Sequence, residues 1–218
     1  MQSGKEGGFF GELVKVIIQA GLIALVVRTL LFQPFNIPSG SMIPTLDIGD
    51  FLFVSKYAYG YSNHSLPFSP PLFNGRILFS PPKRGDVVVF KLPSDGQTDY
   101  IKRVIGLPGD HVTCCNALGE MSVNGTPLDE PYVLKQAGTS AVSLTSFDVV
   151  VPPGDLWVMG DNRYDSKDSR YQTDTPDHGF VPEKDVVGRA FVISWPISRW
   201  TVLSNYPNTF SGVGPPSK

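Results

Sequence analysis

The sequence predicts a mainly β protein, with an antiparallel sheet or barrel-like core, an inserted β subdomain and one N-terminal transmembrane helix. An apolar segment near the N-terminus precedes the β signals. After residue 33, Gly-Asp occurs five times, and four copies lead into β-branched or aromatic runs. The 20 prolines and 22 glycines of the 218 residues are spread out rather than clustered. Turns and strands that alternate in this way are typical of antiparallel sheets.

Residues 13–33 form the candidate membrane anchor. As a helix, this stretch would be about 30 Å long, which matches the hydrocarbon core of a bilayer. Lys15 and Arg28 flank its most apolar part, and each lies near enough to an end to extend its charge to the interface. A buried helix and a cleaved signal peptide are the alternatives, but no small-x-small cleavage site follows the apolar run. Residues 1–12 are expected to form a cytoplasmic tail, although the flanking charges do not set the orientation.

Strands are expected in succession along residues 34–210, the predicted globular domain. The expected strands cover residues 51–54, 87–90, 111–113, 156–159 and 187–195, and Asn124-Gly125 carries a hairpin signal. The inserted β subdomain is expected at about residues 110–155. Residues 62–83 and 172–178 have the composition of loops, and residues 211–218 are expected to be a flexible tail.

Composition argues against several classes of protein. The net charge of −2 gives no basis for nucleic-acid binding. His64, His111 and His178 are scattered, no Cys/His spacing fits zinc, and no Gly-rich phosphate loop is present, so no metal or cofactor is predicted. Cys114 and Cys115 are neighbours, and a bridge between neighbours would close a very small ring. They are interpreted as small residues in a turn, with a redox role as the alternative.

Ser41 and Lys102 are the candidate catalytic pair. A serine hydroxyl is a weak nucleophile unless a base removes its proton, and no histidine lies near Ser41 in the sequence. A lysine can be that base only when it is neutral, which burial in apolar surroundings favours. In a strand, Lys102 would share one face with Tyr100 and Val104 and point into an apolar surface. Arg103 would face the other way, towards solvent or a carboxylate.

The segment around Ser41 suits a nucleophile. Pro38 and Pro44 stiffen the loop, and Gly40 allows a close approach of the backbone to a substrate. Ser39 stands two residues before Ser41, so a hydroxyl and a backbone N–H could meet at one oxyanion. Taken alone, however, a serine in such a segment is a turn residue and a strand lysine is usually solvated. The two segments together favour a Ser/Lys hydrolase at a membrane surface.

A charged segment further along the chain is the candidate support of this pair. It offers two acidic and two basic residues within ten positions, namely Asp161, Arg163, Asp168 and Arg170. Ion pairs among them could support Ser166. The alternative is an ordinary solvated surface loop.

At these residues the chain resembles the type I signal peptidases (leader peptidases) of bacteria. The resemblance covers nearly the whole chain and rests on seven ordered segments, at residues 33–46, 49–54, 85–90, 100–110, 160–163, 166–170 and 179–182. A lone Ser-Met-x-Pro would be less specific, because self-cleaving repressors of the SOS type share it. The chain shows no helix-turn-helix segment of a repressor, and its N-terminus is apolar instead.

The resemblance implies a role for each matching residue. Ser41 is the nucleophile, and Lys102 is the general base that later activates the deacylating water. Ser39 gives an oxyanion-hole hydroxyl beside the Ser41 N–H. The supporting roles are a hydrogen bond from Ser166 to the lysine amine, an ion pair between Asp168 and Arg170, and a cover over Lys102 from Tyr100 and Met42.

The resemblance also implies the substrate and the location. The substrate would be an exported preprotein, cleaved after a small-x-small motif such as Ala-x-Ala and bound as an added strand. The apolar candidates for the substrate pockets, some of them expected to be core as well, are Phe35, Ile37, Met42, Leu46, Leu52, Tyr100 and Ile101. The domain would lie outside the cytoplasm against the bacterial inner membrane, in a single-pass protein near the secretion translocase. No cofactor or nucleic acid is implied.

Two features depart from this family. The sequence has one apolar span where many members have two, and residues 172–178 form a longer link than expected. Two other interpretations therefore remain open: a specialised maturation peptidase of the same clan, such as one serving conjugative pili, and a non-catalytic, membrane-anchored β module that binds extended peptides.

Overall fold

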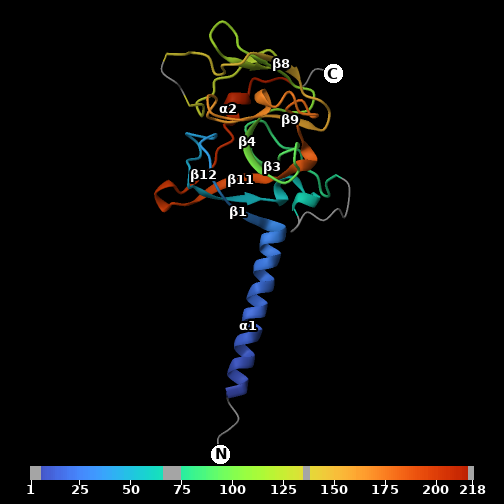
Figure 1. The fold of residues 1–218 in the computed structure, drawn as a ribbon, viewed down its shortest axis with the longest axis vertical. Helices are drawn as coiled ribbons and strands as arrows, with labels where there is room; N and C mark the ends of the chain where they lie inside the picture. The colour runs from blue at the N-terminus through green and yellow to red at the C-terminus, as the bar shows by residue number, and fades with distance from the viewer. Residues whose placement is uncertain (1–5, 66–74, 135–137, 216–218) are drawn as a thin grey trace, which may run out of the picture.

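One long helix leads into a β domain in the computed structural model, which describes residues 6–65, 75–134 and 138–215. Helix α1 (Glu6–Val26) continues into a π-helical turn, η1 (Val27–Leu31), and projects from the domain as a stalk (Figure 1). The 24 residues Gly8–Leu31 are long and apolar enough to cross a membrane, and none of their apolar window is buried. The helix thus begins earlier than the expected anchor at residues 13–33, and Phe32 and Gln33 already belong to the first strand.

The main sheet has eight strands, all paired antiparallel, in the order β1-β2-β11-β3-β4-β9-β10, with β12 beside β11. Its strands are β1 (Phe32–Asn36), β2 (Phe51–Ser55), β3 (Val87–Lys91), β4 (Asp99–Gly106), β9 (Asp155–Met159), β10 (Val181–Pro182), β11 (Val186–Trp195) and β12 (Thr201–Val202). Short helical turns connect them: η2 (Tyr57–Tyr59), η3 (Asn63–Ser65), η4 (Ser169–Tyr171), η5 (Glu183–Asp185), η6 (Ile197–Arg199) and α2 (Pro207–Phe210).

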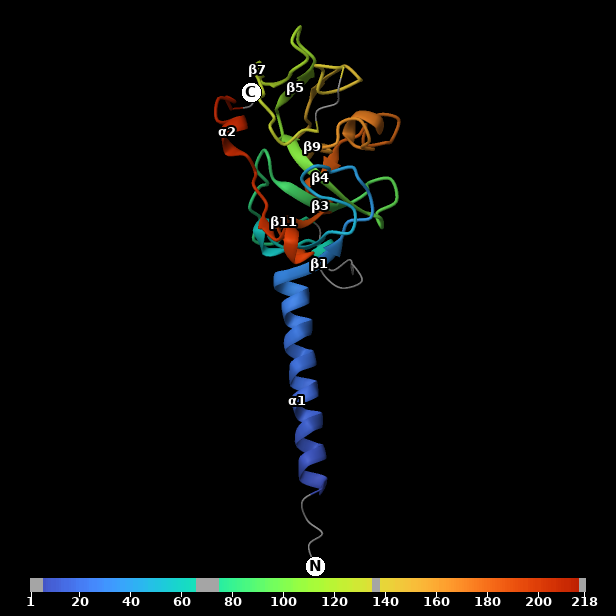
Figure 2. The same ribbon diagram turned by 90° about the vertical axis from the view of Figure 1, so that its left-hand side faces the viewer.

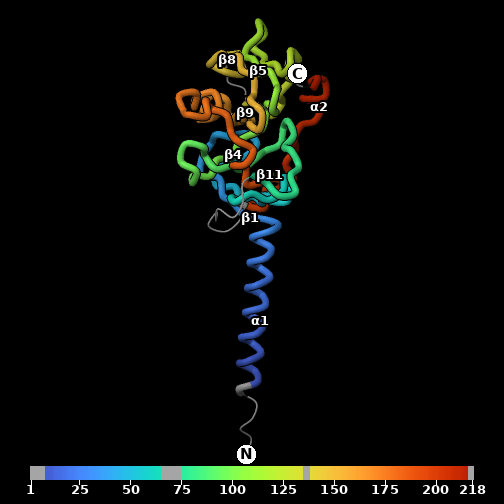
Figure 3. Tube along the Cα trace, turned by 90° about the vertical axis from the view of Figure 1, so that its right-hand side faces the viewer, coloured from blue at the N-terminus to red at the C-terminus, as the bar shows by residue number. Residues whose placement is uncertain are grey.

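A second antiparallel sheet, in the order β7-β6-β5-β8, lies at the end of the domain away from the helix (Figures 1 and 2). Its strands are β5 (His111–Cys114), β6 (Met121–Val123), β7 (Thr126–Pro127) and β8 (Phe147–Val150). They fall within the stretch expected for the insert. The tube view places β9, β4 and β11 between this sheet and β1, which adjoins the helix (Figure 3).

The mainly β prediction is confirmed, and each expected strand occurs within a residue or two of its predicted position. The hairpin signal is also confirmed, because Asn124 and Gly125 join β6 to β7 with positive φ values of 51° and 78°. Both central residues of a type I′ turn need such values, which Asn-Gly adopts at low cost. Parts of the expected loop 62–83, insert 110–155 and two tails, namely residues 66–74, 135–137, 1–5 and 216–218, lie outside the described residues.

The two cysteines are joined to each other. Cys114 ends β5 with its side chain in the core, and a disulfide links it to Cys115. The sequence left the pairing of these two residues open, and the structure shows them linked. The ring is small, but the strand ends at Cys114, so no ladder hydrogen bond has to continue through Cys115.

A cluster of buried apolar side chains fixes the loop between β1 and β2 to the sheet. Ile37, Met42 and Leu46 come from this loop and pack with Leu52 of β2 and with residues of β3 and β11. Each fully buried side chain of this size contributes about 1.5–3 kcal/mol of burial free energy. The loop is therefore held at several points along its length, which matters because it contains Ser41.

Candidate active site

Ser41 and Lys102 meet although 61 residues separate them in the chain. Lys102 Nζ and Ser41 Oγ lie 2.8 Å apart, and the two residues are only 3% and 7% exposed. Lys102 is held by β4, where it pairs with Val88 of β3. Ser41 is held by its loop, because the next side chain, Met42, is completely buried and the Ile43 N–H donates to the Gly40 carbonyl at 3.2 Å.

The surroundings of Lys102 favour its neutral form. Burial lowers the pKa of Lys102 from its usual 10.5 to about 8, although Asp168 and Asp161 act in the opposite direction. The amine donates to the Ile101 carbonyl at 2.8 Å, and its nitrogen lies 5.4 Å from the centre of the Tyr100 ring. A neutral amine has one lone pair, and at 2.8 Å that lone pair can accept the proton of the Ser41 hydroxyl.

Arg103, the next residue, lies on the other face of β4 and is completely buried. Its guanidinium donates to both carboxylate oxygens of Asp161, at 2.8 and 2.6 Å, and to the Gly85 carbonyl at 2.7 Å. It also stacks 4.2 Å from the centre of the Tyr132 ring. Of the two expectations for Arg103, the carboxylate is therefore correct and solvent is wrong.

The four charged side chains singled out in the segment 161–170, namely Asp161, Arg163, Asp168 and Arg170, are buried rather than solvated. Arg170 donates to both oxygens of Asp168, at 2.9 and 2.8 Å, so the expected ion pair is present. Asp168 also accepts the Gly160 N–H at 2.9 Å. This pair connects the segment to the end of β9, beside the lysine whose pKa it influences.

Ser166 is close to this site but makes a different contact from the expected one. Its side chain is buried, and its Oγ has no hydrogen-bond partner among the described residues, so the bond to the lysine amine is not formed here. Gly160 explains why the segment comes so near. A Cβ atom at Gly160 would collide with Ser166 Oγ and with the Ser41 carbonyl, so only glycine allows this approach.

The two donors expected for an oxyanion are the Ser41 N–H and the Ser39 hydroxyl. The Ser41 N–H makes no hydrogen bond to another described residue. Ser39 is exposed, so its hydroxyl is open to a bound substrate. Together with a buried Ser/Lys pair, this arrangement suits acyl transfer, in which the nucleophile, the base and the oxyanion donors surround one carbonyl.

Comparison with known proteins agrees with this chemistry. The family model of signal peptidases, peptidase S26, matches residues 10–195. The chain belongs to this family, the S26 signal peptidases. Signal peptidase I of Pseudomonas aeruginosa is 40% identical over 221 residues, covering 88% of this chain and 74% of that protein.

Other members are similar to a comparable extent. Signal peptidase I of Rickettsia typhi is 35% identical over 213 residues, covering 82% of this chain and 78% of that protein. A crystal structure of a signal peptidase I from Enterococcus faecalis is 31% identical, covering 50% of this chain and 97% of that one, with a TM-score of 0.42. Membership in the family makes the chain a serine endopeptidase of the signal peptidase I type.

The apolar candidates for substrate contact divide into two groups. The buried group belongs to one core cluster and consists of Ile37, Met42, Leu46 and Leu52. Phe35, Tyr100 and Ile101 are partly exposed and pack at the edges of the core clusters. In this S26 peptidase the second group is therefore the part of the set with accessible surface, and the Tyr100 ring centre lies 5.4 Å from Lys102 Nζ.

Several residues of the site could not be found from the sequence. Glu130 forms a buried ion pair with Arg163, at 2.6 and 3.1 Å, across 33 residues. Thr45 donates to Asp161, and Asn162 contacts the loop of Ser41. None of these pairings has a spacing signal, although Asn162 does stand within a segment already singled out.

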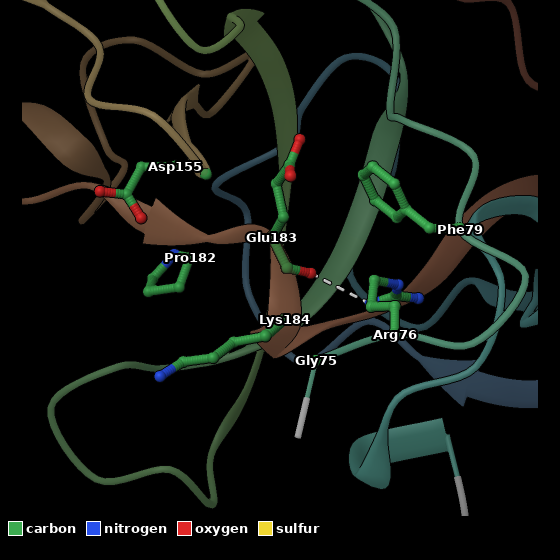
Figure 4. Close-up of a pocket in the computed structure, with 8 residues that line it drawn as sticks. Gly75, Arg76, Phe79, Asp155, Pro182, Glu183 and Lys184 are labelled. Atoms are coloured by element: carbon green, nitrogen blue, oxygen red, sulfur yellow. Dashed lines mark hydrogen bonds between the residues drawn. The ribbon is translucent and has the colours of Figure 1, made fainter. Parts of the chain in front are cut away.

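A separate cavity of about 520 Å³ lies between residues 75–79, the start of β9 and η5. In Figure 4 its charged side chains, Asp155, Glu183 and Lys184, point apart rather than towards one ligand. Arg76 there donates to the Glu183 carbonyl at 3.0 Å, which ties the segment to η5. Within the described part of the chain no group of three His, Cys, Asp or Glu side chains is placed to hold a metal.

Proposed function

We propose that this peptidase removes signal peptides from exported preproteins after small-x-small sites such as Ala-x-Ala, with Ser41 as nucleophile and Lys102 as general base. The observation that supports this most is the 2.8 Å contact between Lys102 Nζ and Ser41 Oγ in a buried site. The lowered pKa of Lys102, about 8, agrees with a base that is partly neutral near physiological pH.

The reaction proceeds by acyl transfer. Lys102 takes the Ser41 proton as Oγ bonds to the scissile carbonyl carbon, and the carbonyl oxygen becomes an oxyanion held by the Ser41 N–H and the Ser39 hydroxyl. The lysine ammonium then gives its proton to the leaving amine, and the peptide C–N bond breaks. Lys102 next removes a proton from water, which attacks the ester carbonyl carbon. The bond between that carbon and Ser41 Oγ then breaks, the lysine ammonium returns the proton to Oγ, and the signal peptide is released.

The surroundings of Lys102 stabilise its transient ammonium form. Asp168 and Asp161 both raise its pKa, and the Ile101 carbonyl accepts one of its hydrogens. Arg170 keeps Asp168 in place with two hydrogen bonds. The buried Ser166 hydroxyl has no hydrogen-bond partner among the described residues. Its oxygen can accept the additional N–H that the lysine gains on protonation.

The substrate binds as an extended strand, and alternate side chains enter the pockets. Phe35 lies on β1, an edge strand of the main sheet, while Tyr100 and Ile101 lie on β4 beside the catalytic lysine. Their partial exposure suits shallow pockets for small side chains, which is the pattern of an Ala-x-Ala site.

The peptidase works at the extracytoplasmic face of the bacterial inner membrane, anchored by α1 and close to the secretion translocase that delivers its substrates. Support comes from the apolar span Gly8–Leu31 and from exposed apolar side chains on β2, on β11 and in the segment from η6 to β12. These side chains, defined here as the membrane-proximal face, are Phe51, Phe53, Trp195, Ile197, Trp200 and Val202.

The test uses the full chain in detergent and a preprotein with an Ala-x-Ala site. Wild-type protein is expected to cut after the second alanine, and Ser41→Ala and Lys102→Ala are expected to lose activity by about 10³-fold or more. Ser211→Ala and Lys184→Ala change exposed residues of the same types and are expected to be fully active. If Ser41→Ala or Lys102→Ala cleaved the preprotein at the wild-type rate, the assignment of Ser41 and Lys102 as the catalytic pair would be contradicted. An inactive wild type would instead point to a maturation peptidase with another substrate or to a peptide-binding module.

A further inference from the structure

Asn162 holds both carbonyl groups that flank the nucleophile. Its side-chain Nδ2 donates to the Gly40 carbonyl at 3.0 Å, and its backbone N–H donates to the Ser41 carbonyl at 3.1 Å. The residue is 8% exposed. It therefore fixes the peptide units on either side of Ser41 from one buried position.

The hydrogen bond from Asn162 to the Gly40 carbonyl determines where the Ser41 N–H points. In a trans peptide unit the carbonyl and the following N–H point in opposite directions. Because the Gly40 carbonyl is directed towards Asn162, the N–H of Ser41 is directed away from it. Gly40 has no Cβ, so this peptide unit would otherwise rotate with little steric cost. Its carbonyl accepts one further hydrogen bond, from the Ile43 N–H at 3.2 Å.

We propose that Asn162 is a positioning residue that directs the Ser41 N–H at the oxyanion of the acyl-transfer reaction. The inference rests on the proposed function, since it assigns that N–H to the oxyanion. Asn162 does not touch the reacting atoms itself. It acts through the Gly40–Ser41 peptide unit.

The orientation of the Asn162 amide is fixed by a second contact. Its Oδ1 accepts the Asp165 N–H at 3.2 Å, so the NH₂ group must face the Gly40 carbonyl. An aspartate at this position would keep the acceptor for Asp165 but would lose the donor to Gly40. It would also place a carboxylate against the carbonyl oxygen, which favours rotation of the peptide unit.

The neighbouring Asp161 has a different partner. It binds Arg103 and Thr45, so its removal would leave a buried guanidinium without its carboxylate. Asn162 has no ionic partner to leave behind. Its replacement therefore tests catalysis with less damage to the fold than replacement of Asp161.

The experiment compares Asn162→Asp and Asn162→Ala with wild type and with Asn208→Asp, the same change at an exposed asparagine of α2. The substrate is an Ala-x-Ala preprotein. Two inhibitors of the same peptide sequence are added: an aldehyde, which forms an oxyanion with Ser41, and a reduced-bond analogue, which has no carbonyl at that position. If the Ser41 N–H no longer points at the oxyanion, kcat is expected to fall by about 10- to 100-fold. This is no more than the effect of removing one oxyanion donor completely.

For both variants we expect KM to stay within about twofold and aldehyde inhibition to weaken by a factor similar to the fall in kcat, because both depend on the oxyanion. Affinity for the reduced-bond analogue should not change, and the pH profile of Asn162→Ala should keep the wild-type inflection. The ratio of the two inhibition constants is independent of the folded fraction, so it remains informative if a variant is less stable.

Unchanged kcat in Asn162→Ala and Asn162→Asp would overturn the inference. Equal loss of affinity for the two inhibitors would also overturn it, because that result indicates a general structural role. Ser41→Ala and Lys102→Ala are measured alongside. If they are inactive while the Asn162 variants behave as wild type, only this inference fails, whereas activity in Ser41→Ala would refute the proposed function itself.

Discussion

Lys102 is balanced between two opposing influences. Its burial favours the neutral amine and lowers its pKa to about 8, while the carboxylates of Asp168 and Asp161 favour the ammonium. The first is needed to accept the proton of Ser41, and the second helps to hold that proton during the reaction. A lysine without the carboxylates would be neutral more often but would be a weaker base.

Replacement of Asp168 with asparagine removes one of the influences that raise the lysine pKa. We expect the rise of kcat/KM with pH to shift to lower pH in Asp168→Asn, since the pKa of Lys102 falls from its value of about 8 when this carboxylate is lost. The measurement is the pH profile of cleavage between about pH 5 and 9, with Asp148→Asn, an exposed carboxylate of the second sheet, as control. A shift to higher pH would show that Asp168 does not act on the lysine by its charge.

Gly160 determines how close the supporting segment comes to the nucleophile. In Gly160→Ala the new methyl group meets Ser166 Oγ and the Ser41 carbonyl, so one of them must move. We expect kcat to fall by about 10²-fold, because a displacement of about 1 Å has an effect of that size on a catalytic group. Gly214→Ala is the control, since a Cβ there meets no atom within 4 Å. Wild-type kcat in Gly160→Ala would contradict the close packing of this segment on the loop.

Strand β4 contains two neighbouring basic residues, Lys102 and Arg103, whose side chains lie in different surroundings. Alternation along the strand places Lys102 and Arg103 on opposite faces, which was predictable from the sequence. The partner of Arg103 was not predictable, because Asp161 lies 58 residues further along. The same holds for Glu130, which lies after β7 and pairs with Arg163 across 33 residues. Local pattern determines which face a side chain takes, but tertiary packing determines what it meets there.

The ion pair between Arg103 and Asp161 links β4 to the supporting segment. Asp161→Asn leaves the buried guanidinium without its charge partner, which is expected to lower the free energy of unfolding by about 3–5 kcal/mol. Chemical unfolding of the full chain in detergent measures it, with exposed Asp174→Asn as the matched control. A loss no larger than that of the control would mean that the pair is not a structural link.

The whole molecule presents an apolar surface next to its apolar helix. The membrane-proximal face lies on β2, β11, β12 and η6, at the end of the domain from which α1 projects (Figure 1). Trp195 and Trp200 are 55% and 63% exposed there, whereas Trp157 is completely buried. Such aromatic side chains are typical of the membrane–water interface.

Brominated lipids test this placement, because they quench tryptophan fluorescence only at short range. In vesicles we expect strong quenching of the wild-type protein. We expect little quenching of Trp195→Phe/Trp200→Phe, in which only Trp157 remains, since that side chain lies inside the domain. Equal quenching of the two proteins would place the domain away from the bilayer surface or in another orientation.

At the scale of the whole chain, the sequence was sufficient for the class of fold and for the pairing of Ser41 with Lys102. The helix that contains the expected anchor begins at Glu6 and is thus longer than the apolar run from which the anchor was predicted. The sequence also left undecided whether Asp161, Arg163, Asp168 and Arg170 are solvated or buried in ion pairs. Asp161 pairs with Arg103 of β4, Arg163 pairs with Glu130 in the segment after β7, and Asp168 and Arg170 pair with each other.

The most direct test of the Ser/Lys pair is the pH dependence of kcat/KM for cleavage of an Ala-x-Ala preprotein by the wild-type protein. The lysine must be neutral to accept the Ser41 proton, so the rate should rise with pH and level off above a pKa of about 8. A profile that is flat between about pH 6 and 9, or that falls as pH rises, would contradict a lysine base.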